Sequence, residues 1–219
     1  MRAKVGILSL SCDVEFIRRR YNRLASIYPF FEFAFALPPG IRARGVARLE
    51  LNPGDAVAEI GCGTGRNFRH LVHAVGSGGS VYGVDYSDGM LEKAKRLCQS
   101  NRWDNVVLLR QDARQLDLPV PVQGALFSFS YSVIPEPQLA LERVWSRLDK
   151  RRHVVIMDGP FFPGILGKLS RPLILLLSKA TVLGDPDSTA GADLAKLGGE
   201  IGKETRNLGT YHIWRATKR

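Results

Sequence analysis

A glycine-rich turn followed by a single carboxylate constrains this chain more than any other feature. The turn, residues 59–65, reads Glu-Ile-Gly-Cys-Gly-Thr-Gly, and Asp85 follows its last glycine by twenty positions. The apolar run 56–60 predicts a buried strand before the turn, and 67–75 predicts a helix after it. Glycines at such a turn let a ligand approach the backbone closely. Because Asp85 ends a second strand-like run, 80–85, its carboxylate is placed to hold two ribose hydroxyls, and the pattern predicts a nucleoside-binding crevice.

The spacing of the glycines separates this turn from the dinucleotide-binding fingerprint. That fingerprint follows G-x-G-x-x-G/A, and its third small residue lets the helix pack closely on the strand. Gly61 and Gly63 match the first two positions, but Arg66 occupies the third. The turn instead follows G-x-G-x-G and opens space at Gly65.

Strand-like and helix-like segments alternate along the rest of the chain. We expect strands at 105–110, 124–130 and 153–158, and helices over 40–49, over 88–100 and from Pro135 to about Leu148. One or two further helices, within 13–36, are expected to cover the crevice. This alternation predicts an α/β fold with a doubly wound parallel sheet, which binds ligands at the carboxyl ends of its strands.

These motifs resemble those of the class I S-adenosylmethionine-dependent methyltransferases. Residues 59–65 are similar to the first motif of that family, 85–91 to its ribose-binding acidic loop, and 111–113 to its adenine-binding turn. Within the family, 21–28 and 130–135 are most similar to the ubiquinone/menaquinone C-methyltransferases and the bacterial phospholipid N-methyltransferases. The resemblance implies a Rossmann-like sheet that is mostly parallel, with an N-terminal helical cap and an antiparallel C-terminal strand. Two antiparallel strands, at 200–206 and 210–216, would complete that sheet.

The resemblance also implies S-adenosylmethionine as cofactor and S-adenosylhomocysteine as product. Asp85 would bind the ribose hydroxyls, Met90 would lie against the adenine, and Asp112 would accept a hydrogen bond from its exocyclic amine. Glu59 would orient the turn or reach the ammonium group of the methionine portion through water. The full set of implied cofactor-binding residues is Glu59, Gly61, Cys62, Gly63, Gly65, Asp85, Tyr86, Met90, Asp112, Ala113 and Ser130.

Three tyrosines are the candidates for positioning the substrate. Tyr21 and Tyr28 occur where the family places a cap over the cofactor, and Tyr131 follows the fourth strand. Aromatic faces there would hold a methylated ammonium by a cation–π attraction of ~1–2 kcal/mol when desolvated, or they would complete the core. Asp158, at the end of the fifth strand, is a candidate for binding a substrate amine. Pro29 stands where the family usually has an aspartate after the second cap tyrosine.

Composition and charge restrict the remaining possibilities. A chain of 219 residues, 45% of them apolar, can bury one core, and we expect a single domain with a cap over 1–50 and a cofactor-binding core over 51–219. The three cysteines have no spacing typical of a metal site or a disulfide framework, so we expect no metal and a cytoplasmic protein.

The net charge of +10 divides into +5 over 1–50, zero over 51–150 and +5 over 151–219. These basic flanks fit a solubilising surface or an anionic partner, which would be a membrane surface or a nucleic acid.

The leading hypothesis is methyl transfer to a small or lipidic acceptor, with the amine of a phospholipid headgroup at the membrane surface as first choice. The alternatives are a quinone-ring C-methyltransferase and a soluble small-amine or thiol methyltransferase. An RNA methyltransferase is a further alternative, because the basic flanks would also bind phosphates. The absence of an Asn/Asp-Pro-Pro-Tyr/Phe motif after the fourth strand disfavours adenine in nucleic acid and protein glutamine as acceptors. A non-catalytic cofactor-binding module is the alternative outside enzymes. The oligomeric state is not predicted.

Overall fold

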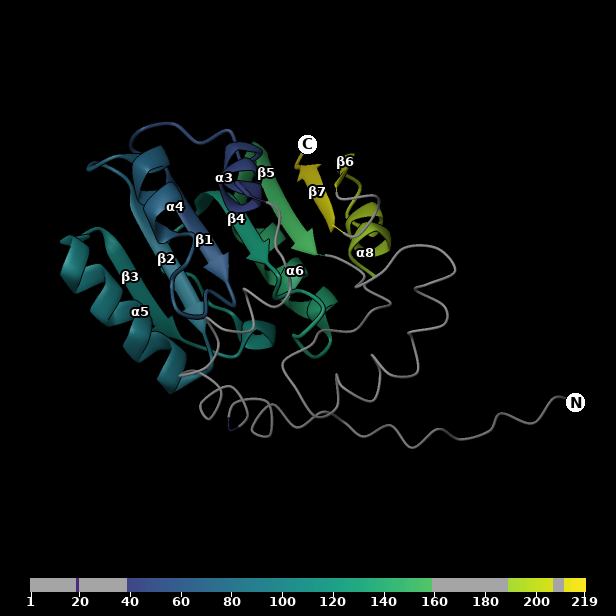
Figure 1. Ribbon diagram of the computed structural model, residues 1–219. Coiled ribbons are helices and arrows are strands. Elements are labelled where there is room, and N and C mark those ends of the chain that lie inside the picture. The colour runs from purple at the N-terminus through teal and green to yellow at the C-terminus, as the bar shows by residue number, and fades with distance from the viewer. Residues whose placement is uncertain (1–18, 20–38, 159–188, 207–210) are drawn as a thin grey trace, which may run out of the picture.

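A single mixed sheet organises the part of the chain that the computed structural model describes, which is residue 19 and residues 39–158, 189–206 and 211–219 (Figure 1). Its strands are β1 (Ala56–Ile60), β2 (Ser80–Asp85), β3 (Val106–Arg110), β4 (Val122–Ser128), β5 (Leu148–Asp158), β6 (Glu200–Arg206) and β7 (Tyr211–Thr217). The helices are α3 (Ile41–Ala47), α4 (Phe68–Val75), α5 (Asp88–Asn101), the 3-10 turn η1 (Ala113–Gln115), α6 (Pro137–Arg147) and α8 (Ala190–Lys196).

The strand order is β3-β2-β1-β4-β5-β7-β6. The first five of these strands run parallel, and β7 pairs antiparallel with both β5 and β6. The predicted fold class, a doubly wound Rossmann-like sheet with antiparallel strands at the C-terminus, is therefore confirmed. Because the chain steps outward from β1 to β3 and then returns to place β4 on the other side of β1, the order reverses there. A crevice at the carboxyl ends of the strands is expected at such a reversal.

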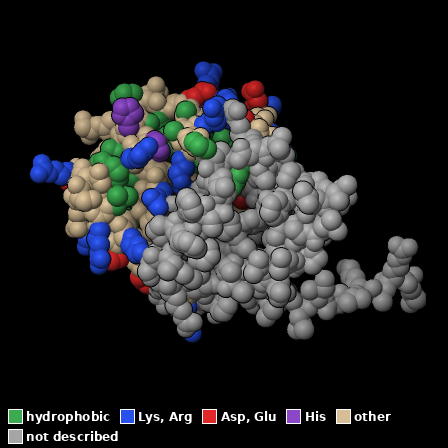
Figure 2. All heavy atoms as spheres, viewed as in Figure 1, with side chains coloured by type: hydrophobic (Ala, Val, Ile, Leu, Met, Phe, Trp, Pro, Cys, Tyr) green, Lys and Arg blue, Asp and Glu red, His purple; other side chains and the backbone are tan. Residues whose placement is uncertain are grey.

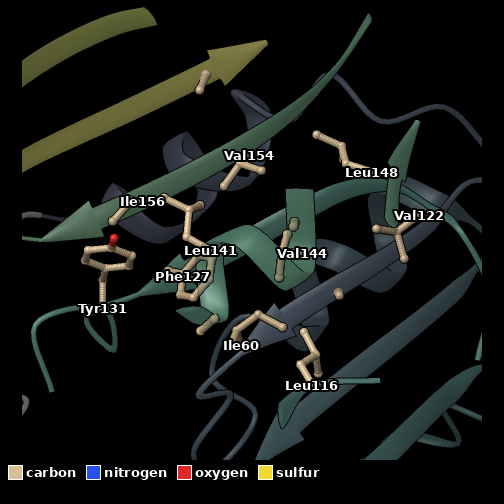
Figure 3. Close-up of a cluster of buried hydrophobic side chains, with 14 of the residues drawn as sticks. Ile60, Leu116, Val122, Phe127, Tyr131, Leu141, Val144, Leu148, Val154 and Ile156 are labelled. Carbon is tan, nitrogen blue, oxygen red and sulfur yellow. The ribbon is translucent and has the colours of Figure 1, made fainter. Parts of the chain in front are cut away.

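Helices cover both faces of the sheet (Figure 1). Buried residues of α3, α4 and α5 form one apolar cluster with the strands, and those of α6 and α8 form the other. Side chains alternate along β5, so that Val154 and Ile156 belong to the cluster on the α6 face while Val155 and Met157 belong to the opposite one. Figure 3 shows the α6 cluster, in which Phe127, Leu141, Val144 and Ile156 pack between helix and sheet.

Helix α3 lies unusually close to the sheet. A Cβ atom at Gly45 would stand 2.1 Å from the sulfur of Met157 on β5, so a larger residue here would require the Met157 side chain to move. The helix therefore packs directly over β4 and β5, with Ile41 and Val46 buried beneath it. The packing of α3 on these strands fixes the direction in which the side chain of Arg42 leaves the helix.

Several boundaries differ from the expectations from sequence, and β5 differs most at its start, since it begins at Leu148 rather than His153. Strand β4 ends at Ser128 rather than Ser130, because Phe129 adopts a left-handed backbone conformation with φ 55°. Helix α8 occupies residues 190–196, where no helix was expected.

Apart from Arg19, the expected cap helices within 13–36 lie outside the described residues, and the division into cap and core stays a prediction. None of the helices in the described part of the chain combines the length and apolar character needed to cross a bilayer.

Candidate functional site

A pocket opens at the carboxyl ends of the four parallel strands around the reversal point. It encloses about 920 Å³ of space, part of it open to solvent. Its walls come from the loops after β1, β2, β3 and β4, with Arg42 of α3 and Met90 of α5 added from the helices. The pocket therefore lies at the place that the strand order predicts.

The glycine turn after β1 forms the floor of the pocket. All three of its glycines have positive φ angles, 69° at Gly61, 55° at Gly63 and 81° at Gly65. A Cβ atom at Gly61 would stand 2.5 Å from the Cβ of Ser130, whereas one at Gly63 would meet nothing within 4 Å. Gly61 thus lets the loops after β1 and β4 touch, and Gly63 leaves open space above the backbone.

Asp85 is held at the end of β2 by backbone donors. The amide of Gly63 donates to Oδ2 and that of Ser87 donates to Oδ1, both at 2.8 Å. Burial raises the pKa of this carboxyl, and the two backbone hydrogen bonds oppose the rise. The carboxylate is consequently fixed against the glycine turn, on the wall of the pocket.

Glu59 places a second carboxyl beneath the turn, and its exposed fraction is only 1%. The side-chain amide of Asn67 donates to Oε1 at 2.5 Å, while Oε2 is buried without a hydrogen-bond partner among the described residues. Burial raises the pKa of Glu59 to about 8, with partial opposition from the Asn67 hydrogen bond. An unsatisfied oxygen in a pocket wall is costly unless a ligand supplies a donor.

The loop after β3 closes the far side of the pocket. Asp112 accepts hydrogen bonds from the backbone amide of Arg114 at 3.0 Å and from its guanidinium at 2.8 Å. Burial would raise the pKa of Asp112, but Arg114 outweighs it and the pKa is lowered. Arg114 also pairs with Glu136 at 3.2 Å, which ties this loop to the segment after β4. Ala113 lines the pocket beside Asp112.

The other cofactor-site candidates line the same pocket. Met90 is 1% exposed, and its amide donates to Oγ of Ser87 at 3.2 Å, which caps α5. Ser130 donates its hydroxyl to the carbonyl of Ile60 at 2.6 Å. Burial raises the pKa of the Cys62 thiol well above its usual range, so this cysteine is a small buried wall residue rather than a nucleophile. Tyr86 stands at the rim with the guanidinium of Arg110 5.8 Å from its ring centre.

The fold and this pocket can be compared with those of known proteins. A family model described as a methyltransferase domain matches residues 57–151. Residues 57–151 are thus similar to a methyltransferase domain. The match covers β1 to β4 and therefore every loop that lines the pocket.

Two curated proteins and one crystal structure are similar to the methyltransferase domain and its surroundings. The demethylmenaquinone methyltransferase of Desulfitobacterium hafniense (strain Y51) is 31% identical over 157 residues, which are 68% of this chain and 61% of that protein. The aklanonic acid methyltransferase DauC of Streptomyces sp. (strain C5) is 29% identical over 150 residues, 68% of this chain and 67% of that one. A SAM-dependent methyltransferase from Aquifex aeolicus shares the fold, with a TM-score of 0.65 at 19% identity over 83% of this chain and 94% of that one. The chain thus spans about three fifths of the length of the first relative.

The pocket of the methyltransferase domain fits S-adenosylmethionine, the cofactor of this class. Asp85 offers a fixed carboxylate for the ribose hydroxyls, and Met90 offers an apolar surface for the adenine. Gly63 leaves room for the ligand over the turn. The unsatisfied Oε2 of Glu59 is suited to an ammonium group, which the methionine portion carries. In the described residues, no three His, Cys, Asp or Glu side chains are grouped so as to hold a metal ion.

Unlike the cofactor-site candidates, the described candidates for binding the substrate do not line the pocket. Tyr131 does not line the pocket, because its ring is fully buried against Phe127 and its hydroxyl donates to Asp193 at 3.1 Å (Figure 3). Asp158 accepts a hydrogen bond from Ser132 at 3.0 Å and is also outside the pocket wall. Tyr21 and Tyr28 lie outside the described residues.

Arg42 and Phe129 line the pocket and were not singled out from the sequence, and neither was Asn67, which is buried beside Arg42. Arg42 reaches the pocket from α3, where its Nη1 donates to Asn67 Oδ1 and Ser128 Oγ, each at 3.2 Å. Asn67 joins Arg42 to Glu59, and Phe129 lines the wall after β4. No short sequence motif identifies Arg42 as a site residue, because its hydrogen-bond partners lie 25 and 86 positions away in the sequence. The positive φ of Phe129 is likewise visible only in the folded chain.

Proposed function

We propose that this protein transfers the methyl group of S-adenosylmethionine to a ring carbon of a quinol-like acceptor. The observation that carries the proposal is the composition of the pocket wall. Its β2 and β3 side offers the carboxylates that a nucleoside requires, and its β4 side adds the apolar side chains of Phe129, Val133, Ile134 and Pro135. A bound sulfonium supplies an activated methyl group, so the protein's task is mainly to position the acceptor and exclude water.

The relatives support this acceptor class over the phospholipid amine that the sequence favoured. Their names refer to demethylmenaquinone and aklanonic acid, and neither refers to a phospholipid. Among the described residues, the β4 side of the pocket adds apolar side chains and no carboxylate that would bind an amine, which favours the same acceptor class. The quinone-ring alternative therefore becomes the main proposal.

A labelling experiment tests the proposal. The protein is incubated with methyl-labelled S-adenosylmethionine and, in parallel, with chemically reduced demethylmenaquinone, phosphatidylethanolamine vesicles or RNA. We expect label in the quinol fraction and its loss in the Asp85→Ala variant. Label in the amine lipid or the RNA, with none in the quinol, would overturn the proposal.

A lipid-soluble acceptor would be met at a membrane, and we propose that the basic flanks bring the protein to an anionic lipid surface. In Figure 2, Lys and Arg side chains are spread over the described face rather than gathered in one patch. Binding to the lipid surface would therefore depend on the basic flanks. Arg19 is exposed, and Arg18 and Arg20 lie outside the described residues. Sedimentation with anionic vesicles, weakened by salt and by Glu at positions 18–20, is the expected result. Equal sedimentation with neutral vesicles would contradict it.

A further inference from the structure

The β4 side of the pocket combines apolar groups with a fixed positive charge. Two arginines line the pocket, but they differ in setting. Arg66 is exposed directly after the glycine turn, whereas Arg42 is half-buried and in contact with β4. A guanidinium held in a partly desolvated wall attracts anions more strongly than one in solvent. Arg42 therefore adds a partly buried positive charge to this side of the pocket.

The guanidinium of Arg42 has a fixed orientation. Its central carbon lies 5.5 Å from the centre of the Phe129 ring, and its Nη1 is bonded to both Asn67 and Ser128. The helix that carries it is seated on β5 through the contact of Gly45 with Met157. Contacts from one helix and two segments of the α/β core thus hold the charge against the face of an aromatic ring.

Phe129 is itself held in an unfavourable backbone conformation. Bulky residues rarely adopt a positive φ, and such strain is concentrated at functional sites. Its amide donates to the carbonyl of Met157 at 2.8 Å, and its ring makes an edge contact with Tyr211 at 6.0 Å between centroids. The strain interrupts the strand alternation, so that Ser128, Phe129 and Ser130 all line the pocket. An aromatic surface is therefore presented where a strand would have turned it away.

We propose that Arg42 and Phe129 form the acceptor subsite, and that this subsite takes a flat ring bearing an ionised oxygen. The inference rests on the proposed function and narrows its substrate class to phenolates and enolates. The ring would pack against Phe129 while Arg42 stabilises the negative oxygen through charge-assisted hydrogen bonds. A cationic or amine acceptor would be repelled by the same side chain.

The charge on the oxygen matters for the reaction. An ionised oxygen raises the electron density of the neighbouring ring carbon. That carbon donates an electron pair to form the new carbon–methyl bond, while the sulfur–methyl bond breaks with its pair remaining on sulfur. The hydrogen on the ring carbon then leaves as a proton to water, which restores the ring and its oxygen anion. By favouring the anion, Arg42 would hold the acceptor in its nucleophilic form.

Binding of two matched probes tests the subsite. The anionic probe is 2-hydroxy-1,4-naphthoquinone, which is ionised at neutral pH, and the neutral probe is its methyl ether. In the presence of S-adenosylhomocysteine, we expect the wild-type protein to bind the anion about tenfold more tightly than the ether. Arg42→Gln should abolish this preference, and Phe129→Leu should weaken both probes equally.

Arg44→Gln is the matched control. Arg44 lies on the same helix, is exposed and pairs with Glu204 at 3.6 Å, so its removal should leave the preference intact. Calorimetry with S-adenosylhomocysteine checks each variant for folding and for cofactor binding. A wild-type protein without preference for the anion would overturn the inference. So would an Arg42→Gln variant that keeps the preference but binds the cofactor product tenfold more weakly, since Arg42 would then serve the cofactor. If the preference depends on Arg42 but no quinol is methylated, the proposed function fails while the subsite stands.

Discussion

The two sides of the pocket are built in different ways. The cofactor side, residues 59–65, 85–90 and 111–113, consists of loops that follow neighbouring strands, and backbone amides of these loops hold its Asp85 carboxylate. The proposed acceptor side, Arg42 with residues 128–135, is assembled from α3 and from the end of β4 with the loop after it. The hydrogen-bond partners of Arg42 lie 25 and 86 positions from it in the sequence. If the proposed assignment of the two sides holds, binding of the cofactor depends on local backbone geometry, whereas selection of the acceptor depends on tertiary packing.

Replacing Asp85 gives the largest expected effect and tests whether the cofactor side acts alone. Asp85→Ala removes the carboxylate proposed to bind two ribose hydroxyls, and we expect about 100-fold weaker binding of S-adenosylhomocysteine by calorimetry. Asp104→Ala, an exposed aspartate before β3, is the control and should bind normally. Unchanged affinity of Asp85→Ala, with an intact fold, would mean that the ribose is held elsewhere.

Gly61 tests the junction between the two sides. Gly61→Ala introduces a Cβ 2.5 Å from that of Ser130 at a φ of 69°, so overpacking adds to backbone strain. We expect the free energy of unfolding to fall by about 3 kcal/mol in urea titrations. Gly63→Ala is the matched control, because its φ is 55° but its Cβ meets nothing within 4 Å, and it should cost only about 1 kcal/mol. Equal losses in both variants would show that the contact between the sides carries no strain.

The cofactor side could be predicted from the sequence because its constraints are local. Glycines at fixed spacing, a strand ending in a carboxylate and the alternation of strands and helices indicated the sheet, the turn and the place of Asp85. The implied cofactor residues from Glu59 to Ser130 all line one pocket, except that Gly65 lies behind the turn, packed against Phe68.

The acceptor side could not be predicted in the same way. Alternation along an ideal strand would place Phe129 and Tyr131 on one face. The positive φ of Phe129 instead turns its ring into the pocket wall, and Tyr131 is buried in the core. Arg42 reaches the site from α3, which packs against β4 and β5 with Gly45 next to the Met157 side chain. Such contacts depend on the packed structure and leave no spacing in the sequence.

Glu59, on the cofactor side, should make the free energy of unfolding depend on pH. Its pKa is about 8 in the folded protein against an ordinary value of 4.5. Below 4.5 both states are protonated and no penalty exists. As the pH rises from there to about 8, the unfolded state loses the proton first, so stability falls. We expect Glu59→Gln to remove this fall and to raise the free energy of unfolding at neutral pH by roughly 1–3 kcal/mol.

The measurement for Glu59 is urea unfolding at several pH values, with Glu92→Gln as control. Glu92 is an exposed residue that pairs with Arg96 one helical turn away, so its replacement should change stability by only a few tenths of a kcal/mol. A pH profile of Glu59→Gln that parallels the wild type would show that Glu59 is ionised in the folded state.

Tyr131 gives the smallest expected effect and separates the acceptor side from the core behind it. Tyr131→Phe removes the hydroxyl that donates to Asp193, while Thr189 and Lys196 still satisfy that carboxylate. We expect a loss of about 1 kcal/mol in the free energy of unfolding, with unchanged cofactor affinity and acceptor KM. Phe129→Leu should behave in the opposite way, raising acceptor KM with little change in stability. If Tyr131→Phe instead raised the acceptor KM, Tyr131 would belong to the acceptor side. The pocket wall would then include a residue that is assigned here to the core.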